Sequence, residues 1–398
     1  MKGLLPFGTA EQRARYLPRL ASGELIAAFC LTEPGAGSDA ASVRTTARRQ
    51  SDGRWRLDGE KFWITNGGIA DLYTVFARTD EDGGKMSAFI VEAAWAGVTH
   101  GTHEDKMGIR ASSTTTVSFT DVQVPAENLL GEPGKGFKIA MAILNSGRTG
   151  LGGGAVGGMK SLLAMSTRHA LERRQFGRSI ADFGLVRQKL AQMAVDCFAA
   201  ESTVWMVAHY VDSGVEDYSV EAAMSKVFAS DAMTVRPTKP CRSPAGRPSC
   251  ARTATNRPPA MPAPCRSSRH QRDPADVCRH VRPEAGRSVP RGTALCAGRH
   301  LQPSHVRGIV DRQADLARLA GVAIGLFVGL CTLSRALNPQ VLGGGSPTQA
   351  AAMARTFARQ ARRRMAASLR RLNRNEDDVM DAVATELIDK EGYRWDVV

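Results

Sequence analysis

The chain has 398 residues, of which 43% are hydrophobic, and its formal net charge is +14 at pH 7. The length suffices for two or three domains, and the hydrophobic share excludes a fibrous or wholly disordered chain. The charge alone would suggest a protein that binds nucleic acid or a membrane surface. However, residues 235–310 hold fourteen Arg and one Lys against three acidic residues, about +12, so the rest carries only about +2.

The first predicted element is a short helix from Ala10 to Leu20, with Thr9 as its N-cap. Residues 1–23 would form a helical remnant that has little before the first strand to pack on. The apolar run over residues 1–7 is too short for a secretory signal peptide. Outside residues 235–310 the cysteines Cys30, Cys197 and Cys331 are scattered along the chain, which makes a reducing compartment the default. We therefore expect a soluble, intracellular protein in the cytoplasm, with peripheral membrane association as an alternative.

Residues 24–130 show short alternating segments separated by Gly and Asp, which predicts an all-β domain. An apolar strand from Leu25 to Leu31 opens it. Asp58-Gly59, inside the run from Arg54 to Trp63, predicts the turn of a β-hairpin. Further strands are expected at Leu72–Arg78, Ser87–Glu92 and Thr114–Phe119. A central antiparallel sandwich or barrel follows from this pattern.

Two features of this β domain point to a ligand. The strand ending at Leu31 breaks into Pro34-Gly35-Ala36-Gly37-Ser38, where glycines let another group approach the backbone N–H groups closely. Trp63 and Thr65 alternate on a later strand, so their side chains face the same side. A flat aromatic ring beside small hydrogen-bond donors suits a planar heterocycle with a phosphate tail.

From residue 131 the apolar period becomes helical. Residues 131–233 predict part of a helical bundle, and residues 311–398 a C-terminal helical region. The expected helices are Lys138–Glu172, Gly184–Val211, Ser219–Ala232, Arg312–Arg335, Gln349–Leu372 and Asn375–Lys390. The uncharged run from Leu319 to Ser334 is short for a bilayer span, which favours a buried helix and no transmembrane segment.

Residues 234–310 differ from the rest of the chain. Residues 235–310 hold twelve Pro and five of the eight Cys, with no aromatic residue and no apolar period, which predicts disorder. We hypothesise a frameshifted stretch of a GC-rich coding region. A basic linker that binds nucleic acid is the alternative, but it lacks the aromatic residues that stack on bases. Cys278, His280, Cys296 and His300 match no zinc spacing, so no metal site is expected.

Several motifs together resemble the acyl-CoA dehydrogenase family. They are the runs Thr32–Asp39, Lys61–Gly67, Gly134–Lys138 and Arg173–Gly177. Three further runs are most similar to its very-long-chain branch, which has an extra C-terminal helical domain: Asn145–Arg148, Gly184–Val186 and Cys331–Arg335. The resemblance implies an α+β multi-domain fold whose N-terminal helical domain is mostly absent here, so that the chain would be truncated.

The resemblance also implies a reaction and its participants. In this family FAD takes a hydride from the β-carbon of an acyl-CoA, a carboxylate removes the α-proton, and an electron-transfer flavoprotein reoxidises the flavin. Family members are homodimers or homotetramers, and the very-long-chain branch is dimeric, so a homodimer is expected. The FAD contacts implied by position are Phe29, Leu31, Thr32, Gly37, Ser38, Trp63, Thr65, Arg173, Gln175 and Phe176. The acyl-CoA contacts are Ser38, Asn145 and Arg148.

Three departures from the family pattern bear on activity. Only the last helix of the N-terminal domain is expected. No Gln-x-x-Gly-Gly loop for the adenine end of FAD follows the helix that contains Asp231. No Glu-Gly-Thr run supplies the base after residue 233, and Gly147 occupies the position that a minority of the family uses for it.

We therefore assign no catalytic residue and expect an impaired or inactive acyl-CoA dehydrogenase of fatty acid β-oxidation. The alternatives are a non-enzymatic protein that binds flavin or a CoA ester, and a nucleic-acid binder that uses the basic segment.

Overall fold

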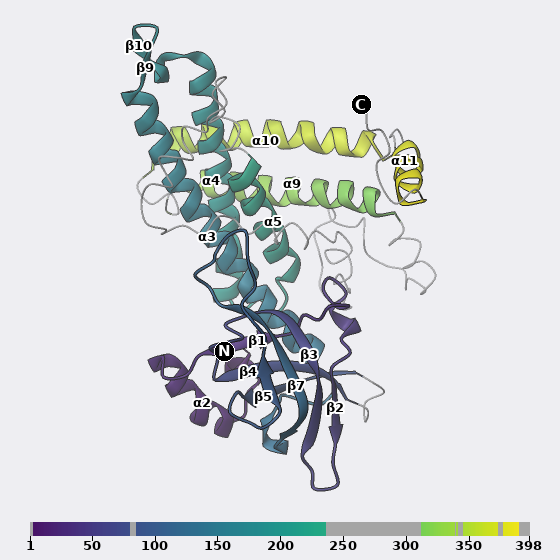
Figure 1. Ribbon diagram of the computed structural model, residues 1–398. Helices are drawn as coiled ribbons and strands as arrows, with labels where there is room; N and C mark the ends of the chain where they lie inside the picture. The colour runs from purple at the N-terminus through teal and green to yellow at the C-terminus, as the bar shows by residue number, and fades with distance from the viewer. Residues whose placement is uncertain are drawn as a thin grey trace. The chain divides into compact units, whose positions relative to one another are not determined.

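The computed structural model describes residues 3–79, 85–235, 312–338, 340, 345–372 and 377–389. These residues divide into two compact units, a sheet unit up to Gly147 and a helical unit from Arg148 onward. The predicted segment 234–310 lies almost wholly outside the described residues. Figure 1 shows the strands of the sheet unit and the helices of the helical unit.

The sheet unit contains one eight-stranded sheet in the order β6-β7-β3-β2-β4-β5-β8, with β1 beside β4. The strands are β1 (Ala27–Cys30), β2 (Thr46–Arg49), β3 (Trp55–Thr65), β4 (Leu72–Thr79), β5 (Met86–Glu92), β6 (Val98–His100), β7 (Thr114–Val124) and β8 (Leu129–Leu130). Most pairs are antiparallel, as predicted, but β4 pairs in parallel with both β1 and β2. Long connections permit this pairing. The sheet is therefore mixed and open, which rules out the barrel of the two predicted alternatives, sandwich or barrel.

The predicted hairpin turn at Asp58-Gly59 was also wrong, because β3 continues through these residues. The chain turns earlier, where the Gln50 N–H donates to Arg54 O at 2.7 Å and Gly53 has a φ of 85°. Gly59, with a φ of 151°, lies at a register shift against β7, and a Cβ there would come within 2.7 Å of the Thr45 backbone. Glycine is therefore needed at this position because the Thr45 backbone lies so close, and not because the chain turns here.

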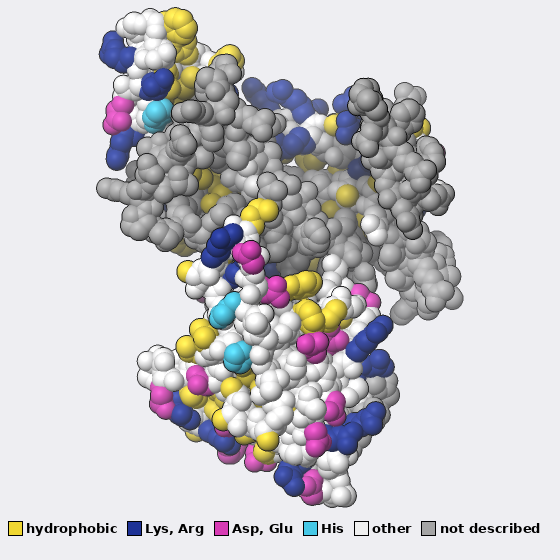
Figure 2. Space-filling view, viewed as in Figure 1, with side chains coloured by type: hydrophobic (Ala, Val, Ile, Leu, Met, Phe, Trp, Pro, Cys, Tyr) yellow, Lys and Arg dark blue, Asp and Glu magenta, His cyan; other side chains and the backbone are white. Residues whose placement is uncertain are grey.

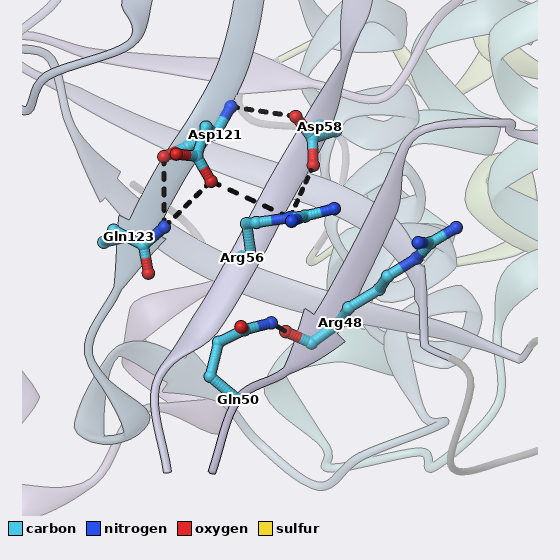
Figure 3. Close-up of polar contacts among 6 residues, drawn as sticks. All are labelled: Arg48, Gln50, Arg56, Asp58, Asp121 and Gln123. Atoms are coloured by element: carbon cyan, nitrogen blue, oxygen red, sulfur yellow. Dashed lines mark hydrogen bonds and ion pairs between the residues drawn. The ribbon is translucent and has the colours of Figure 1, made fainter. Parts of the chain in front are cut away.

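Exposed and half-buried polar side chains hold this irregular stretch together (Figure 3). The Asp121 N–H, at a φ of 51°, donates to Asp58 Oδ1 at 2.8 Å. Arg56 Nε donates to Asp58 Oδ2 at 3.2 Å and lies 3.7 Å from Asp121 Oδ1, while Gln123 binds Asp121 on the other side. On β2, Gln50 donates to the Arg48 carbonyl. Asp58 therefore stabilises an irregularity in the pairing of β3 with β7, not a turn.

The sheet buries apolar side chains on both faces. One face carries Trp55, Phe89 and Phe119. The other packs against α1 (Leu4–Phe7), α2 (Ala10–Ser22) and the start of α3 (Gly136–Glu172). Thr9 caps α2 as predicted, and Tyr16 is buried with its hydroxyl on Glu92. The first helix therefore does have a surface to pack on, contrary to the sequence-based expectation.

The helical unit contains the rest of α3 with α4 (Gly184–Asp212), α5 (Ser219–Val235), α9 (Gln313–Leu337), α10 (Pro347–Arg370) and α11 (Asp377–Asp389). All six predicted helices are thus present. A small hairpin, β9 (Arg174–Gln175) and β10 (Arg178–Ser179), separates α3 from α4. The helices α4, α9 and α10 share a core around Val195, Val328 and Phe357. Figure 2 shows Lys and Arg side chains gathered in the region of α10, whose Arg355, Arg359, Arg362 and Arg363 are exposed.

Glu201 on α4 joins three helices of this unit. It forms an ion pair with Lys160 on α3, and Arg335 Nη1 on α9 lies 2.8 Å from its Oε2 atom. The Arg335 guanidinium also lies over the Phe198 ring. The apolar helix α9 is therefore fixed at its C-terminal end by a charge contact.

The helix α9 is less buried than its composition predicts. Leu316, Val328 and Cys331 are buried, but Leu326 and Leu330 are at least half exposed. Among the described residues α9 alone is long and apolar enough to cross a membrane, which by itself is weak evidence of a span.

A buried ion pair fixes the connection between β1 and β2 onto β3. Lys61 Nζ donates to Glu33 Oε1 at 2.7 Å and to Leu31 O at 3.2 Å, and both charged side chains are almost fully buried. Glu33 also accepts from Thr45 Oγ1 at 2.6 Å and from the Arg44 N–H at 2.5 Å. Every oxygen of the carboxylate thus has a partner, which is the condition under which a buried charge is tolerated.

The charge state of Glu33 follows from these contacts. Burial alone raises the pKa of the Glu33 carboxyl, but hydrogen bonds from Lys61, Thr45 and the Arg44 N–H outweigh burial and lower that pKa. Burial also lowers the pKa of Lys61, and Glu33 opposes this shift. We infer that the pair is ionised at neutral pH.

The variant Lys61→Met should lower the free energy of unfolding by about 3–5 kcal/mol, because it leaves a buried carboxylate without its countercharge. Urea unfolding followed by tryptophan fluorescence measures this. The double variant Lys61→Met/Glu33→Gln should recover part of the loss. If the single and double variants are equally unstable, the charge of Glu33 is not the cause.

The same pair predicts a pH dependence. A carboxyl whose pKa is lowered by folding contributes stability above its unfolded pKa of about 4.3, and this stability is lost as the pH falls. Glu33→Gln should therefore flatten the acid side of the curve of melting temperature against pH. The matched control Glu60→Gln changes an exposed carboxylate on β3 and should leave that curve unchanged.

Candidate functional site

The turn after β1 is tight and its glycines are open. The Glu33 N–H donates to Ala36 O and the Ala36 N–H donates to Glu33 O, both at 3.1 Å. A Cβ at Gly35 or Gly37 would have no atom within 4 Å, and neither residue has a positive φ. Neither backbone conformation nor packing within the chain therefore requires glycine at these two positions. What glycine provides here is a bare backbone that an outside group can approach.

Trp63 is exposed and its backbone is strained. On β3, Lys61 lies opposite Val117 and Ile64 opposite Thr115, so one extra residue bulges between them. Trp63 has a φ of 54° and its side chain is 59% exposed. A bulky residue in this region costs roughly 1–3 kcal/mol, and such strain is concentrated at functional sites. The bulge turns a large flat ring outward rather than into the core.

A backbone hydrogen bond joins the residue before the glycine turn to the strand that carries Trp63, and a second bond fixes the end of that strand to β4. The Phe62 N–H donates to Thr32 O at 2.9 Å, directly beside Trp63. The Tyr73 hydroxyl donates to Gly67 O at 2.8 Å, and burial raises the pKa of Tyr73 to about 12, so the hydroxyl remains a donor. The structure therefore brings Thr32, the open glycines and Trp63 into one neighbourhood of the sheet unit.

The other FAD contacts predicted in the sheet unit divide into exposed residues and residues that pack in the core. Gly37, Ser38 and Thr65 are exposed, and Thr65 lies opposite Thr114 in the sheet. The side chains of Phe29 and Leu31 instead contribute to the core. Phe29 packs its ring edge against Phe76 at 5.1 Å, and Leu31 is buried. Phe29 is only partly buried, so part of its ring stays accessible, whereas the side chain of Leu31 is enclosed in the core.

Asn145 and Arg148 lie three residues apart on α3 and are both partly buried. This spacing puts them on one face of the helix. Between them, a Cβ at Gly147 would have no atom within 4 Å. The position that Gly147 occupies is therefore open to a larger side chain.

Arg173, Gln175 and Phe176 lie in the helical unit, at the hairpin β9–β10. The turn has positive φ at both central residues, 51° at Phe176 and 76° at Gly177, as in a type I′ turn. Phe176 is 92% exposed, and Arg173 and Gln175 are exposed beside it. A phenylalanine in a strained, solvated turn contributes little to folding, so this tip is suited to a contact outside the helical unit.

Some predicted features cannot be located. The segment expected to carry the adenine loop and the base lies outside the described residues. A Gln-x-x-Gly-Gly run does occur at 340–344, after α9 rather than after α5, and only its Gln340 is described. No group of three His, Cys, Asp or Glu side chains in the described part of the chain could hold a metal ion.

The sequence analysis missed the role of Lys61 and Glu33, although both belong to the quoted motifs. The available signal was a lysine at an inward position of an alternating strand, because a buried lysine requires a carboxylate partner.

Three stretches of the chain match models of known protein families. Residues 28–122 match the family described as acyl-CoA dehydrogenase, middle domain, and residues 134–235 match its C-terminal domain. Residues 299–393 match the ACAD9/ACADV C-terminal domain.

Among curated relatives, the mitochondrial very long-chain specific acyl-CoA dehydrogenase of Bos taurus is 52% identical over 239 residues. This match covers 58% of this chain and 36% of the relative, so the chain spans about a third of that protein's length. The human protein of the same name is 51% identical over the same shares.

Two solved structures are similar as well. The butyryl-CoA dehydrogenase of Megasphaera elsdenii is 42% identical, with a TM-score of 0.57 over 60% of this chain and 63% of that one. An acyl-CoA dehydrogenase from Bacillus anthracis, solved in complex with FAD, is 29% identical with a TM-score of 0.68 over 92% of this chain and 72% of that one. Family matches across both units, together with relatives at about half identity, show that this chain belongs to the acyl-CoA dehydrogenase family.

Proposed function

We propose that this chain binds FAD and a fatty acyl-CoA, and that it dehydrogenates the acyl chain between its α- and β-carbons only slowly. The open glycine turn that the Lys61–Glu33 pair holds beside the strained, exposed Trp63 carries the proposal. The folding of the sheet unit does not explain these features, whereas a planar cofactor lying against the turn does.

The residues of the sheet unit fit a flavin. Backbone N–H groups at Gly37 and Ser38, with the Thr32 and Thr65 hydroxyls, would donate to ring nitrogen and oxygen atoms, and Trp63 would cover one side. The relative from Bacillus anthracis is solved with FAD. At the hairpin, Arg173 with Gln175 and Phe176 would contact the FAD of a neighbouring subunit, where a guanidinium suits a pyrophosphate.

For the substrate, Ser38 together with Asn145 and Arg148 on α3 would contact the acyl-CoA. One matched structure is a complex of glutaryl-CoA dehydrogenase with glutaryl-CoA. Arg148 supplies a permanent positive charge, which suits the phosphates or the polarised thioester of a CoA ester.

When bound, FAD would supply the acceptor for the hydride that leaves the β-carbon. The residues of this chain would orient the two molecules and exclude water, but the α-proton also needs a base. Gly147 has no side chain to take it, and a positioned base contributes roughly 10²–10⁴-fold to such a step. We therefore propose weak dehydrogenation by this chain, and we keep a non-enzymatic protein that binds flavin or a CoA ester as the second candidate.

The remaining assignments follow from the family. We propose an electron-transfer flavoprotein as the electron acceptor, and one matched structure is that of an electron transferring flavoprotein from Acidaminococcus fermentans. The curated relatives quoted above are mitochondrial, so mitochondria are the alternative to the expected cytoplasm. A protein without flavin whose affinity for nucleic acid falls steeply with salt would favour the third candidate, a nucleic-acid binder.

The substitution Gly37→Val should weaken flavin binding without loss of stability. Its side chain meets no atom of this chain but would occupy the space of the bound ring. We expect the affinity for FAD, measured by quenching of flavin fluorescence, to fall at least tenfold, or about 1.4 kcal/mol. Absorption bands near roughly 370 and 450 nm in the purified protein give the starting flavin content.

Gly108→Val is the matched control, because Gly108 is also open and has an ordinary φ but lies outside the proposed flavin contacts. It should retain the affinity of the unchanged chain. If both variants bind FAD as the unchanged chain does, the glycine turn is not the flavin site.

The substitution Gly147→Glu should restore a base. The glutamate fits, since nothing lies within 4 Å of the Cβ position. We expect a long-chain acyl-CoA to bleach the flavin band on the order of 10²–10⁴ times faster than in the unchanged chain. Gly150→Glu places the same group at another open position of α3 and should not raise the rate. An unchanged rate in Gly147→Glu, with flavin and acyl-CoA still bound, would favour the non-enzymatic alternative.

A further inference from the structure

The ammonium group of Lys61 contacts the peptide unit that carries the Thr32 N–H. Lys61 Nζ donates to Leu31 O at 3.2 Å, and the Lys61 side chain is fully buried. Leu31 O and the Thr32 N–H belong to the same peptide unit, which is planar and conjugated. In a low-dielectric interior, a hydrogen bond to the carbonyl of a peptide polarises the whole unit, and successive hydrogen bonds strengthen one another. The Thr32 N–H is therefore a stronger donor than an ordinary backbone amide.

This polarised donor is available to a ligand. In the part of the chain that the structure describes, neither the N–H nor the hydroxyl of Thr32 has a hydrogen-bond partner. Thr32 is half-buried, and its carbonyl accepts from the Phe62 N–H at 2.9 Å, which holds the residue beside Trp63. A donor that is fixed in position before a ligand arrives can stabilise negative charge on that ligand without reorganisation.

The two charges of the buried pair are held in different ways. Glu33 accepts hydrogen bonds from Lys61 Nζ, from Thr45 Oγ1 and from the backbone N–H groups of Arg44 and Thr45. These donors spread the negative charge of the carboxylate. Lys61 Nζ instead donates to Glu33 Oε1 and to Leu31 O. Leu31 O is therefore in direct contact with the cation of the pair.

We propose that Lys61 is a positioning residue that raises the electron affinity of the bound flavin, because its charge acts through the Leu31–Thr32 peptide and stabilises the reduced ring more than the oxidised ring. This inference rests on the flavin binding proposed above. A hydride brings two electrons and one proton to the ring, so the reduced ring carries one more negative charge than the oxidised ring. A positive charge and a strong donor near the ring nitrogens favour that form.

The test measures the affinities of the full chain for oxidised and for reduced FAD under anaerobic conditions, together with the midpoint potential of the bound flavin. Two double variants lack the charge pair. Lys61→Met/Glu33→Gln removes both charges, and Lys61→Gln/Glu33→Gln removes them while it keeps a polar side chain at both positions. The unchanged chain should bind reduced FAD at least tenfold more tightly than oxidised FAD. Each double variant should lose at least tenfold of this preference, which lowers the potential of a two-electron couple by about 30 mV.

Thr45→Val is the matched control. It removes the 2.6 Å hydrogen bond from Thr45 Oγ1 to Glu33, but it leaves the ammonium of Lys61 on Leu31 O. It should change the affinities for oxidised and reduced FAD by the same factor and leave the midpoint potential unchanged. If Lys61 only held the turn in place, the double variants would behave in this way too, because a loosened turn weakens the binding of both forms.

Two results would overturn the role of Lys61 alone. They are an unaltered midpoint potential in double variants that still bind FAD, and an unchanged chain that binds oxidised FAD as tightly as reduced FAD. The second measurement needs no variant, so it decides the matter even where neither double variant folds. An unchanged chain that binds FAD in neither oxidation state would overturn the proposed function as well.

Discussion

The ion pair between Lys61 and Glu33 is the contact on which the candidate site depends. It is buried, both oxygens of its carboxylate accept hydrogen bonds, and it connects the turn after β1 to the strand that carries Trp63. The turn and the bulge would be mobile elements if each had to hold its own conformation. Tying both to one buried charge pair lets the sheet unit hold an open backbone and an exposed aromatic ring in fixed positions. Such preorganisation is what a ligand site requires.

The sequence alone was sufficient to predict the elements that depend on short-range interactions. The cap at Thr9 and the six long helices follow from periodicity and short-range hydrogen bonds. Asp58-Gly59 was misread because the same pair suits a hairpin turn and a bulge. The choice depends on Asp121 and Thr45, which only the folded sheet brings near. The strain at Trp63 was likewise invisible, since it arises from a register shift between two strands.

The burial of helix α9 was also mispredicted from the sequence. Its uncharged sequence predicts burial, but burial depends on how many neighbours surround a helix. In the helical unit the neighbours cover one side and leave a regular leucine stripe exposed. The heptad spacing was present in the sequence, but only the exposed fractions distinguish a partly covered helix from a helix in a core.

The residues proposed for binding depend on the fold of this chain, whereas a catalytic base does not. Trp63 and Phe176 keep strained backbones and exposed rings, and Gly35 and Gly37 stay open although neither backbone conformation nor packing requires glycine there. Strain that folding does not require persists only where the surrounding contacts impose it, here the buried pair and the hairpin turn. The base needs no such support, because a single side chain supplies it. Binding is therefore distributed over contacts that the fold itself maintains, while proton removal depends on one residue whose loss leaves the fold intact.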